Sequence, residues 1–150
     1  MKKSFLGMGI IVLILFTQSV WLNAQETTVP DEVETAFLKK YPSATDVFWA
    51  IDFEEYIASF ENAEFELITV TFSEQGDWLL TDTSLSVDAL PMLAQVNIQK
   101  EFQVEEFYTT NKIETPDKVF YTTTFETATQ MVTLSFDNKG NVTEKVVEDF

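Results

Sequence analysis

The sequence has no cysteine, no histidine and no arginine among its 150 residues. Without histidine the chain has neither an imidazole base nor a serine–histidine–aspartate triad. Without cysteine it has no thiol nucleophile, no disulfide and no thiolate metal site. Without arginine it has no bidentate clamp for phosphate or carboxylate groups. Any catalysis would therefore have to use carboxylates, lysine, tyrosine or hydroxyl groups.

Positive charge is also scarce, because 25 acidic residues stand against nine lysines and give a net charge of −16. Nucleic-acid-binding surfaces carry the opposite sign, so we expect no nucleic-acid partner. The simplest interpretation of the charge is a solvated acidic surface that keeps the protein soluble. If the charge has a specific role, it favours a basic protein partner.

The N-terminal segment, residues 1–24, is predicted to be a secretory signal peptide. Lys2 and Lys3 precede an apolar run from Phe5 to Phe16, which is shorter than the roughly 20 residues of a membrane-spanning helix. We predict cleavage after Ala24, and an uncleaved anchor is the alternative. The mature protein is therefore expected in the periplasm or outside the cell, with no membrane contact after cleavage.

The remaining chain repeats itself. The segment Tyr56–Ala63 recurs 65 residues later as Tyr121–Ala128, and Thr69–Gly76 recurs 64 residues later as Thr133–Gly140. Several matches in the same order and at nearly constant spacing are typical of a tandem duplication. We therefore predict two repeats packed together as one body, which span residues 25–87 and 88–150.

Each repeat is predicted to contain one helix followed by four strands. Apolar residues at helical spacing follow Pro30 in the first repeat and Asp88 in the second. Segments rich in threonine, valine and aromatic residues then predict strands. These strands are 46–53, 55–61, 65–73, 77–83, 105–112, 118–126, 130–136 and 141–148. The predicted fold class is α+β, with two tandem α-β-β-β-β repeats whose helices pack on one face of an antiparallel sheet.

The positions of proline, aromatic and glycine residues resemble those of the PepSY-like family, secreted proteins of Gram-negative bacteria also described as β-lactamase-inhibitor-like. The residues that carry the resemblance are Val29-Pro30, Tyr41-Pro42, Val47-Phe48-Trp49, the strand from Tyr56 to Phe60, and Phe72-x-x-x-Gly76-x-Trp78. The resemblance implies a two-layer fold, a place outside the cytoplasm and no enzymatic activity. Protein inhibition is proposed for the family by analogy.

The second repeat departs from the family pattern at two positions. Gln103 replaces the proline after the helix, and Val142 replaces the tryptophan after the turn. We therefore do not expect the two repeats to present equal binding surfaces.

The first candidate site is the sheet face turned away from the helices, because an uncovered face can present aromatic and threonine side chains to a flat partner. The alternative for each aromatic residue is a place in the core. The side chains of a strand alternate between the two faces of the sheet, and the sequence does not determine which alternate set faces the helices. A bulge near Leu67 would move each set to the opposite face. The candidate binding residues are Trp49, Tyr56, Phe60, Trp78, Tyr108, Tyr121 and Phe125.

Two carboxylate-rich turns, residues 52–55 and 61–66, form a second candidate site, for a hard cation such as Ca²⁺. Residues 137–141 resemble the start of a calcium-binding loop, but the segment that would close the loop has the pattern of a strand. We interpret all three segments as solvated turns, and we predict no metal site and no cofactor.

Catalysis by two carboxylates, as in glycan hydrolysis, is a third candidate. No carboxylate pair is associated with an apolar pocket pattern that would raise one pKa, so we expect no enzymatic activity. A fourth candidate is strand addition at the predicted edge 142–147, although its lysine and glutamates disfavour such pairing.

Taken together, these patterns predict a secreted, non-enzymatic binding module that uses the exposed sheet face for a protein-binding or inhibitory role. A cation- or small-ligand-binding envelope protein is the alternative, and a carboxylate-based glycan hydrolase is the third hypothesis.

Overall fold

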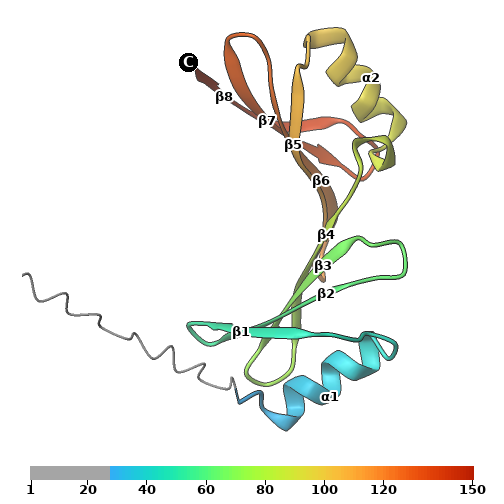
Figure 1. The fold of residues 1–150 in the computed structure, drawn as a ribbon, viewed down its shortest axis with the longest axis vertical. Coiled ribbons are helices and arrows are strands. Elements are labelled where there is room, and N and C mark those ends of the chain that lie inside the picture. Colours follow the sequence, from blue (N-terminus) through green and yellow to red (C-terminus); the bar gives the residue numbers. More distant parts are fainter. Residues whose placement is uncertain (1–27) are drawn as a thin grey trace, which may run out of the picture.

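The computed structural model describes residues 28–150 as two α-helices, a short 3-10 helix and eight strands (Figure 1). The first half contains α1 (Asp31–Lys40), β1 (Phe48–Asp52), β2 (Glu55–Glu61), β3 (Leu67–Ser73) and β4 (Trp78–Ser84). The second half contains η1 (Val87–Ala89), α2 (Met92–Glu101), β5 (Glu106–Glu114), β6 (Val119–Glu126), β7 (Gln130–Asp137) and β8 (Val142–Asp149). The predicted signal peptide lies outside the described residues. Within residues 28–150, no helix is both long and apolar enough to cross a membrane.

The predicted α+β fold is confirmed, and each predicted strand begins and ends within two residues of an observed one. This agreement follows from alternating apolar residues and well-placed turns, which indicate strands strongly. The two halves share one order of elements, a helix and then four strands. That they arose by duplication, with a boundary between residues 87 and 88, stays a prediction.

All eight strands lie in one antiparallel sheet, in the order in which they occur along the chain. The halves meet where β4 pairs with β5, from Thr81 opposite Glu114 to Ser84 opposite Asn111. Backbone hydrogen bonds therefore continue across the middle of the molecule, and the two halves share a single sheet.

The two helices cover the same face of this sheet, one towards each end (Figure 1). Directly opposed residues of neighbouring strands point to the same face. Val70 opposes Thr81, and Thr81 in turn opposes Glu114. Glu114 opposes Val119, which shares its face of β6 with Phe125. The core residues Val70 and Phe125 therefore point to the same side.

Each helix covers its own hydrophobic core. In the first core, Val33 and Phe37 of α1 pack on Ala58, Phe60, Val70 and Phe72. In the second core, Leu90, Ala94 and Ile98 pack on Phe125, Val132, Leu134 and Phe136. Complete burial of one such large side chain contributes about 1.5–3 kcal/mol. Aromatic rings contact one another in the first core. The Phe37 ring lies 5.2 Å from the ring of Trp49 and 5.6 Å from that of Phe60.

Two glycines allow hairpin turns to approach the helices closely. Gly76 in the β3–β4 turn has φ +81°, and Gly140 in the β7–β8 turn has φ +89°. A Cβ atom at Gly76 would lie 2.7 Å from the carbonyl oxygen of Glu32, and one at Gly140 would lie 2.6 Å from the backbone nitrogen of Ala94. Both positions therefore require glycine for conformation and for space.

Replacing Gly140 with alanine should lower the free energy of unfolding by about 2 kcal/mol or more, because the new methyl group meets helix backbone and the left-handed φ is strained. Urea unfolding followed by circular dichroism measures the change. Lys139→Ala, at the exposed neighbouring position, is the control and should stay within about 0.5 kcal/mol of the wild type. A Gly140→Ala variant with wild-type stability would contradict this account.

Candidate functional site

The face of the sheet opposite α1 and α2, here called the helix-free face, is covered by no element of the described chain. A row of side chains crosses this face over seven strands, and each residue directly opposes the next. The row consists of Phe48, Ser59, Thr69, Asp82, Ile113, Phe120 and Asp137. Apolar residues thus occupy the first, fifth and sixth positions of an otherwise polar row.

Polar side chains on the helix-free face are bonded to one another. The hydroxyls of Ser59 and Thr69 lie 3.3 Å apart, and those of Thr124 and Thr133 lie 3.0 Å apart. Asn111 Nδ2 donates to the carboxylate of Asp82, at 2.9 Å from Oδ1 and 3.0 Å from Oδ2. These cross-strand bonds restrict side-chain rotation, so the face is ordered before any partner arrives.

Two shallow hollows lie on the helix-free face, near opposite ends of the row. The first is lined by Phe48, Phe65 and Leu67, with Glu61 beside them. The second is lined by Phe120, Ser135, Asp137, Glu144 and other residues, among them Lys118. The Nζ atom of Lys118 lies 4.7 Å from the centre of the Phe120 ring.

Six of the seven candidate binding residues do not lie on the helix-free face, and the structure gives them the alternative place, in or against the cores. Phe60 and Phe125 are buried in the two cores. The others pack partly buried against those cores, and they are Trp49, Tyr56, Trp78 and Tyr121. The physical reason is that the aromatic side chains fill the space between the sheet and the helices, so the alternate set of residues points outward.

Tyr108, the seventh predicted residue, is half exposed at an irregularity of β5 between Phe107 and Thr109. Its hydroxyl donates a hydrogen bond to the carboxylate of Glu126. This bond is the largest cause that raises the pKa of Tyr108 to about 12.

Two strongly exposed aromatic residues are not among the seven candidates predicted from the sequence. Phe48 is 70% exposed and Phe65 is 85% exposed. The sequence contains one indication that Phe48 is exposed. It is the neighbour of Trp49 in a strand, so the two side chains must point to opposite faces of the sheet. Phe65 lies in a turn, where alternation carries no information.

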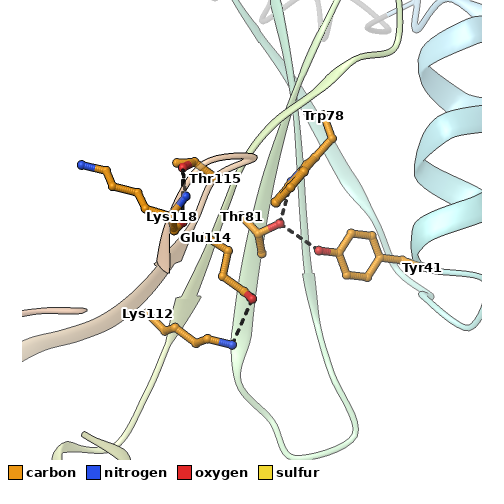
Figure 2. A network of polar contacts seen from close by, with 7 residues as sticks. All are labelled: Tyr41, Trp78, Thr81, Lys112, Glu114, Thr115 and Lys118. Carbon is orange, nitrogen blue, oxygen red and sulfur yellow. Dashed lines mark hydrogen bonds and ion pairs between the residues drawn. The ribbon is translucent and has the colours of Figure 1, made fainter. Parts of the chain in front are cut away.

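On the helix-covered face, a polar network lies between the end of α1 and the middle of the sheet (Figure 2). The buried hydroxyl of Thr81 accepts a hydrogen bond from Trp78 Nε1 at 2.9 Å and lies 2.9 Å from the Tyr41 hydroxyl. Burial raises the pKa of Tyr41. Lys40 Nζ lies 3.9 Å from the centre of the Trp78 ring, a cation–π contact.

A small pocket of about 280 Å³ lies between α2, η1 and the start of β5. Apolar side chains dominate its lining, with Asp88, Gln95 and Gln99 as the polar members. The side chain of Gln95 already donates to the carbonyl groups of Asp88 and Leu90. The pocket could therefore accept a small apolar group, but it contains no arrangement of reactive side chains.

The carboxylate-rich turns bring no metal-binding set together, since residues 28–150 contain no group of three or more suitable ligands. Asp137 instead stabilises its own turn. Its carboxylate accepts hydrogen bonds from the Asn141 side chain at 2.7 Å and from the backbone N–H groups of Lys139 and Asn141. The bond from the Asn141 side chain is the largest cause that lowers the pKa of Asp137.

Comparison with known proteins gives one family and several similar folds. The sequence model of a family described as "Putative beta-lactamase-inhibitor-like, PepSY-like" matches residues 54–144. No curated protein matches the chain significantly.

Three solved structures from Bacteroides species resemble the chain. One, from Bacteroides eggerthii DSM 20697 and described among "putative periplasmic proteins", has a TM-score of 0.72 and 21% identity over 80% of this chain and 89% of that chain. A DUF2874 family protein from Bacteroides uniformis ATCC 8492 has a TM-score of 0.72 and 20% identity over 80% and 90%. A BLIP-like protein from Bacteroides fragilis NCTC 9343 has a TM-score of 0.68 and 22% identity over 82% and 89%. These similarities establish the fold.

Thr81→Val should lower the free energy of unfolding by about 1–3 kcal/mol, because the Tyr41 hydroxyl and the Trp78 N–H lose their partner while the side-chain shape is kept. Urea unfolding followed by tryptophan fluorescence measures the effect. Thr83→Val, at the next position on the same face of β4, is the matched control and should change stability by less than about 0.5 kcal/mol. Equal effects of the two substitutions would refute the role of the network.

Glu126→Gln should lower the pKa of Tyr108 from about 12 towards its ordinary value of 10.0. The variant loses the hydrogen bond to the carboxylate, which is the largest cause of the shift, and also loses the charge of the carboxylate. Ultraviolet titration of tyrosine ionisation measures this shift. Since the folded pKa is raised, the stabilisation from this bond is present below pH 10 and is lost as the pH rises towards 12. An unchanged titration in the variant would show that Glu126 is not the cause.

Proposed function

The chain belongs to the PepSY-like family, and from this membership we propose that it is a secreted, non-enzymatic binding module that recognises a protein partner with the helix-free face of its sheet. The family description, beta-lactamase-inhibitor-like, supports recognition of a protein rather than turnover of a substrate. The absence of histidine, cysteine and arginine from the sequence agrees with this role. A place outside the cytoplasm is supported by the similar fold described as periplasmic.

The observation that carries the proposal is the continuous row of side chains on the helix-free face. Its seven strands are separated by steps of about 4.8 Å, so the row spans about 29 Å. A typical stable protein interface buries about 800 Å² on each partner, which corresponds to a patch of similar width. The face is therefore large enough for specific recognition without help from the helices.

The chemistry of the face also suits a protein partner. Phe48, Ile113 and Phe120 provide apolar contact, and the paired hydroxyl groups around them lose little rotational freedom on binding. The net charge of −16 would attract a basic partner from a distance and raise its rate of association.

Thr69→Lys, at the third position of the row, tests the proposal. Residues 25–150 are immobilised and used to capture a partner from the envelope and secreted fractions of the source bacterium. The affinity for the captured protein is then measured by surface plasmon resonance. The new lysine should weaken binding about tenfold or more, because it adds bulk and positive charge to a face that meets a basic surface.

Gln99→Lys is the matched control, because it makes the same change in net charge on the exposed surface of α2. We expect it to keep the wild-type affinity. Melting temperatures of both variants check that the fold is intact. A Thr69→Lys variant that binds like the wild type would exclude the helix-free face as the site.

A further inference from the structure

One corner of the helix-free face, next to the β2–β3 turn, exposes three large apolar side chains together. We call it the Phe65 corner, and it consists of Phe48, Phe65 and Leu67. These residues are 70%, 85% and 50% exposed, respectively, and they line the same hollow. Contiguous exposed apolar side chains with a polar rim are typical of an interaction site.

The conformation of Phe65 is unfavourable for a phenylalanine. Its φ is 62°, in the left-handed region that bulky residues rarely adopt. Glycine or asparagine would occupy this position with less strain. Because the side chain is 85% exposed, burial in this chain does little to offset the strain.

The turn itself is held by other residues. Asn62 Oδ1 accepts hydrogen bonds from the backbone N–H groups of Glu64 and Glu66, each at 2.9 Å. Asn62 Nδ2 donates to the Glu66 carboxylate at 2.8 Å. The Phe65 ring takes no part in these bonds, so the turn does not need it. Phe53 in the β1–β2 turn has a similar φ and exposure, so strain alone does not mark a site. What distinguishes Phe65 is that its ring shares one hollow with two further exposed apolar side chains, Phe48 and Leu67.

The charge around the Phe65 corner is predominantly negative. The nearest lysine is Lys40 at the end of α1, which lines an adjoining hollow together with Glu61 and Asn62. From residue 41 to residue 99 the sequence contains eleven carboxylates and no lysine. Asp46 and Glu61 border the hollow itself, and Glu64 precedes Phe65 in the turn. In the second half, by contrast, β5 and β8 carry Lys112 and Lys145. The negative potential of the sheet is therefore concentrated in the first half.

We propose that the Phe65 corner binds a cationic amphipathic segment of a partner protein. Apolar side chains of this segment would cover Phe48, Phe65 and Leu67. Its lysine or arginine side chains would face Asp46, Glu61 and Glu64. The charge complementarity favours this occupant over an anionic membrane surface or a nucleic acid, both of which the carboxylates repel. The inference rests on the proposed function and specifies the chemistry of the partner.

The probe for this proposal is a fluorescently labelled synthetic peptide of about 14 residues, with leucines at helical spacing and lysines elsewhere. A second peptide has serine in place of leucine, and a third has glutamate in place of lysine. Binding to residues 25–150 is measured by fluorescence anisotropy at physiological ionic strength, where the Debye length is about 8 Å. Only the leucine–lysine peptide should bind well. Equally tight binding of the serine–lysine peptide would overturn the proposal, because charge alone would explain it.

Phe65→Asn is the decisive variant, and Phe53→Asn is its control. Phe53 lies in the β1–β2 turn at the other end of β2, with φ 54° and 95% exposure, and it also has acidic neighbours. Both substitutions relieve the same strain and remove the same ring. We expect Phe65→Asn to weaken peptide binding about tenfold or more and Phe53→Asn to leave it within about twofold. Both variants should melt at or above the wild-type temperature, because asparagine tolerates the left-handed conformation.

Unchanged binding by Phe65→Asn, or an equal loss in Phe53→Asn, would overturn the proposal. A clear fall in the melting temperature of Phe65→Asn would also count against it, because the ring would then have a structural role. Leu67→Thr provides an independent check within a strand, and it should also weaken binding.

The two proposals can fail separately. If Thr69→Lys weakens binding of the captured partner while Phe65→Asn leaves peptide binding unchanged, only the Phe65 corner is refuted. If the reverse is found, the corner binds cationic segments and the wider face is not the partner site.

Discussion

Antiparallel pairing of β4 with β5 joins the two halves, and the arrangement of both surfaces follows from its register. Thr81 opposes Glu114, and this pair places the cores around Val70 and Phe125 on the same side of the sheet. A slip of one residue would turn every side chain of the second half to the other face. Helix α2 would then cover part of the face that is now free. The register of the β4–β5 pairing therefore determines that one face of the sheet stays free of helices.

The two faces of the sheet have different physical roles. The helix-covered face gains stability from apolar burial, and its few buried hydroxyls are bonded, as Thr81 is by Trp78 and Thr110 is by Thr123. The helix-free face has cross-strand pairs of hydroxyl and amide groups with apolar side chains between them. Strain is found at exposed turns, at Phe53 and Phe65, where it does not disturb either core.

The two halves have the same order of elements, but the residues at their surfaces differ. Trp78 donates to Thr81 and lies beneath Lys40, whereas Val142, at the position that departs from the family pattern, is 42% exposed on the edge strand. In the strands, lysines are confined to the second half. An unequal contribution of the halves to binding, as the departures Gln103 and Val142 led us to expect, agrees with these differences.

Local patterns in the sequence determined the order of the elements, the extent of each strand and the turns at Gly76 and Gly140, because alternation and glycine act over a few residues. Tertiary structure alone decided which face of each strand is covered. Alternation defines two sets of side chains in a strand but does not say which set meets a helix. For this reason the sequence left both places open for Phe60 and Phe125, which lie in the cores. Phe48 and Phe65 line one hollow only because β1 and the β2–β3 turn meet at the same corner of the folded sheet, a proximity that no local pattern records.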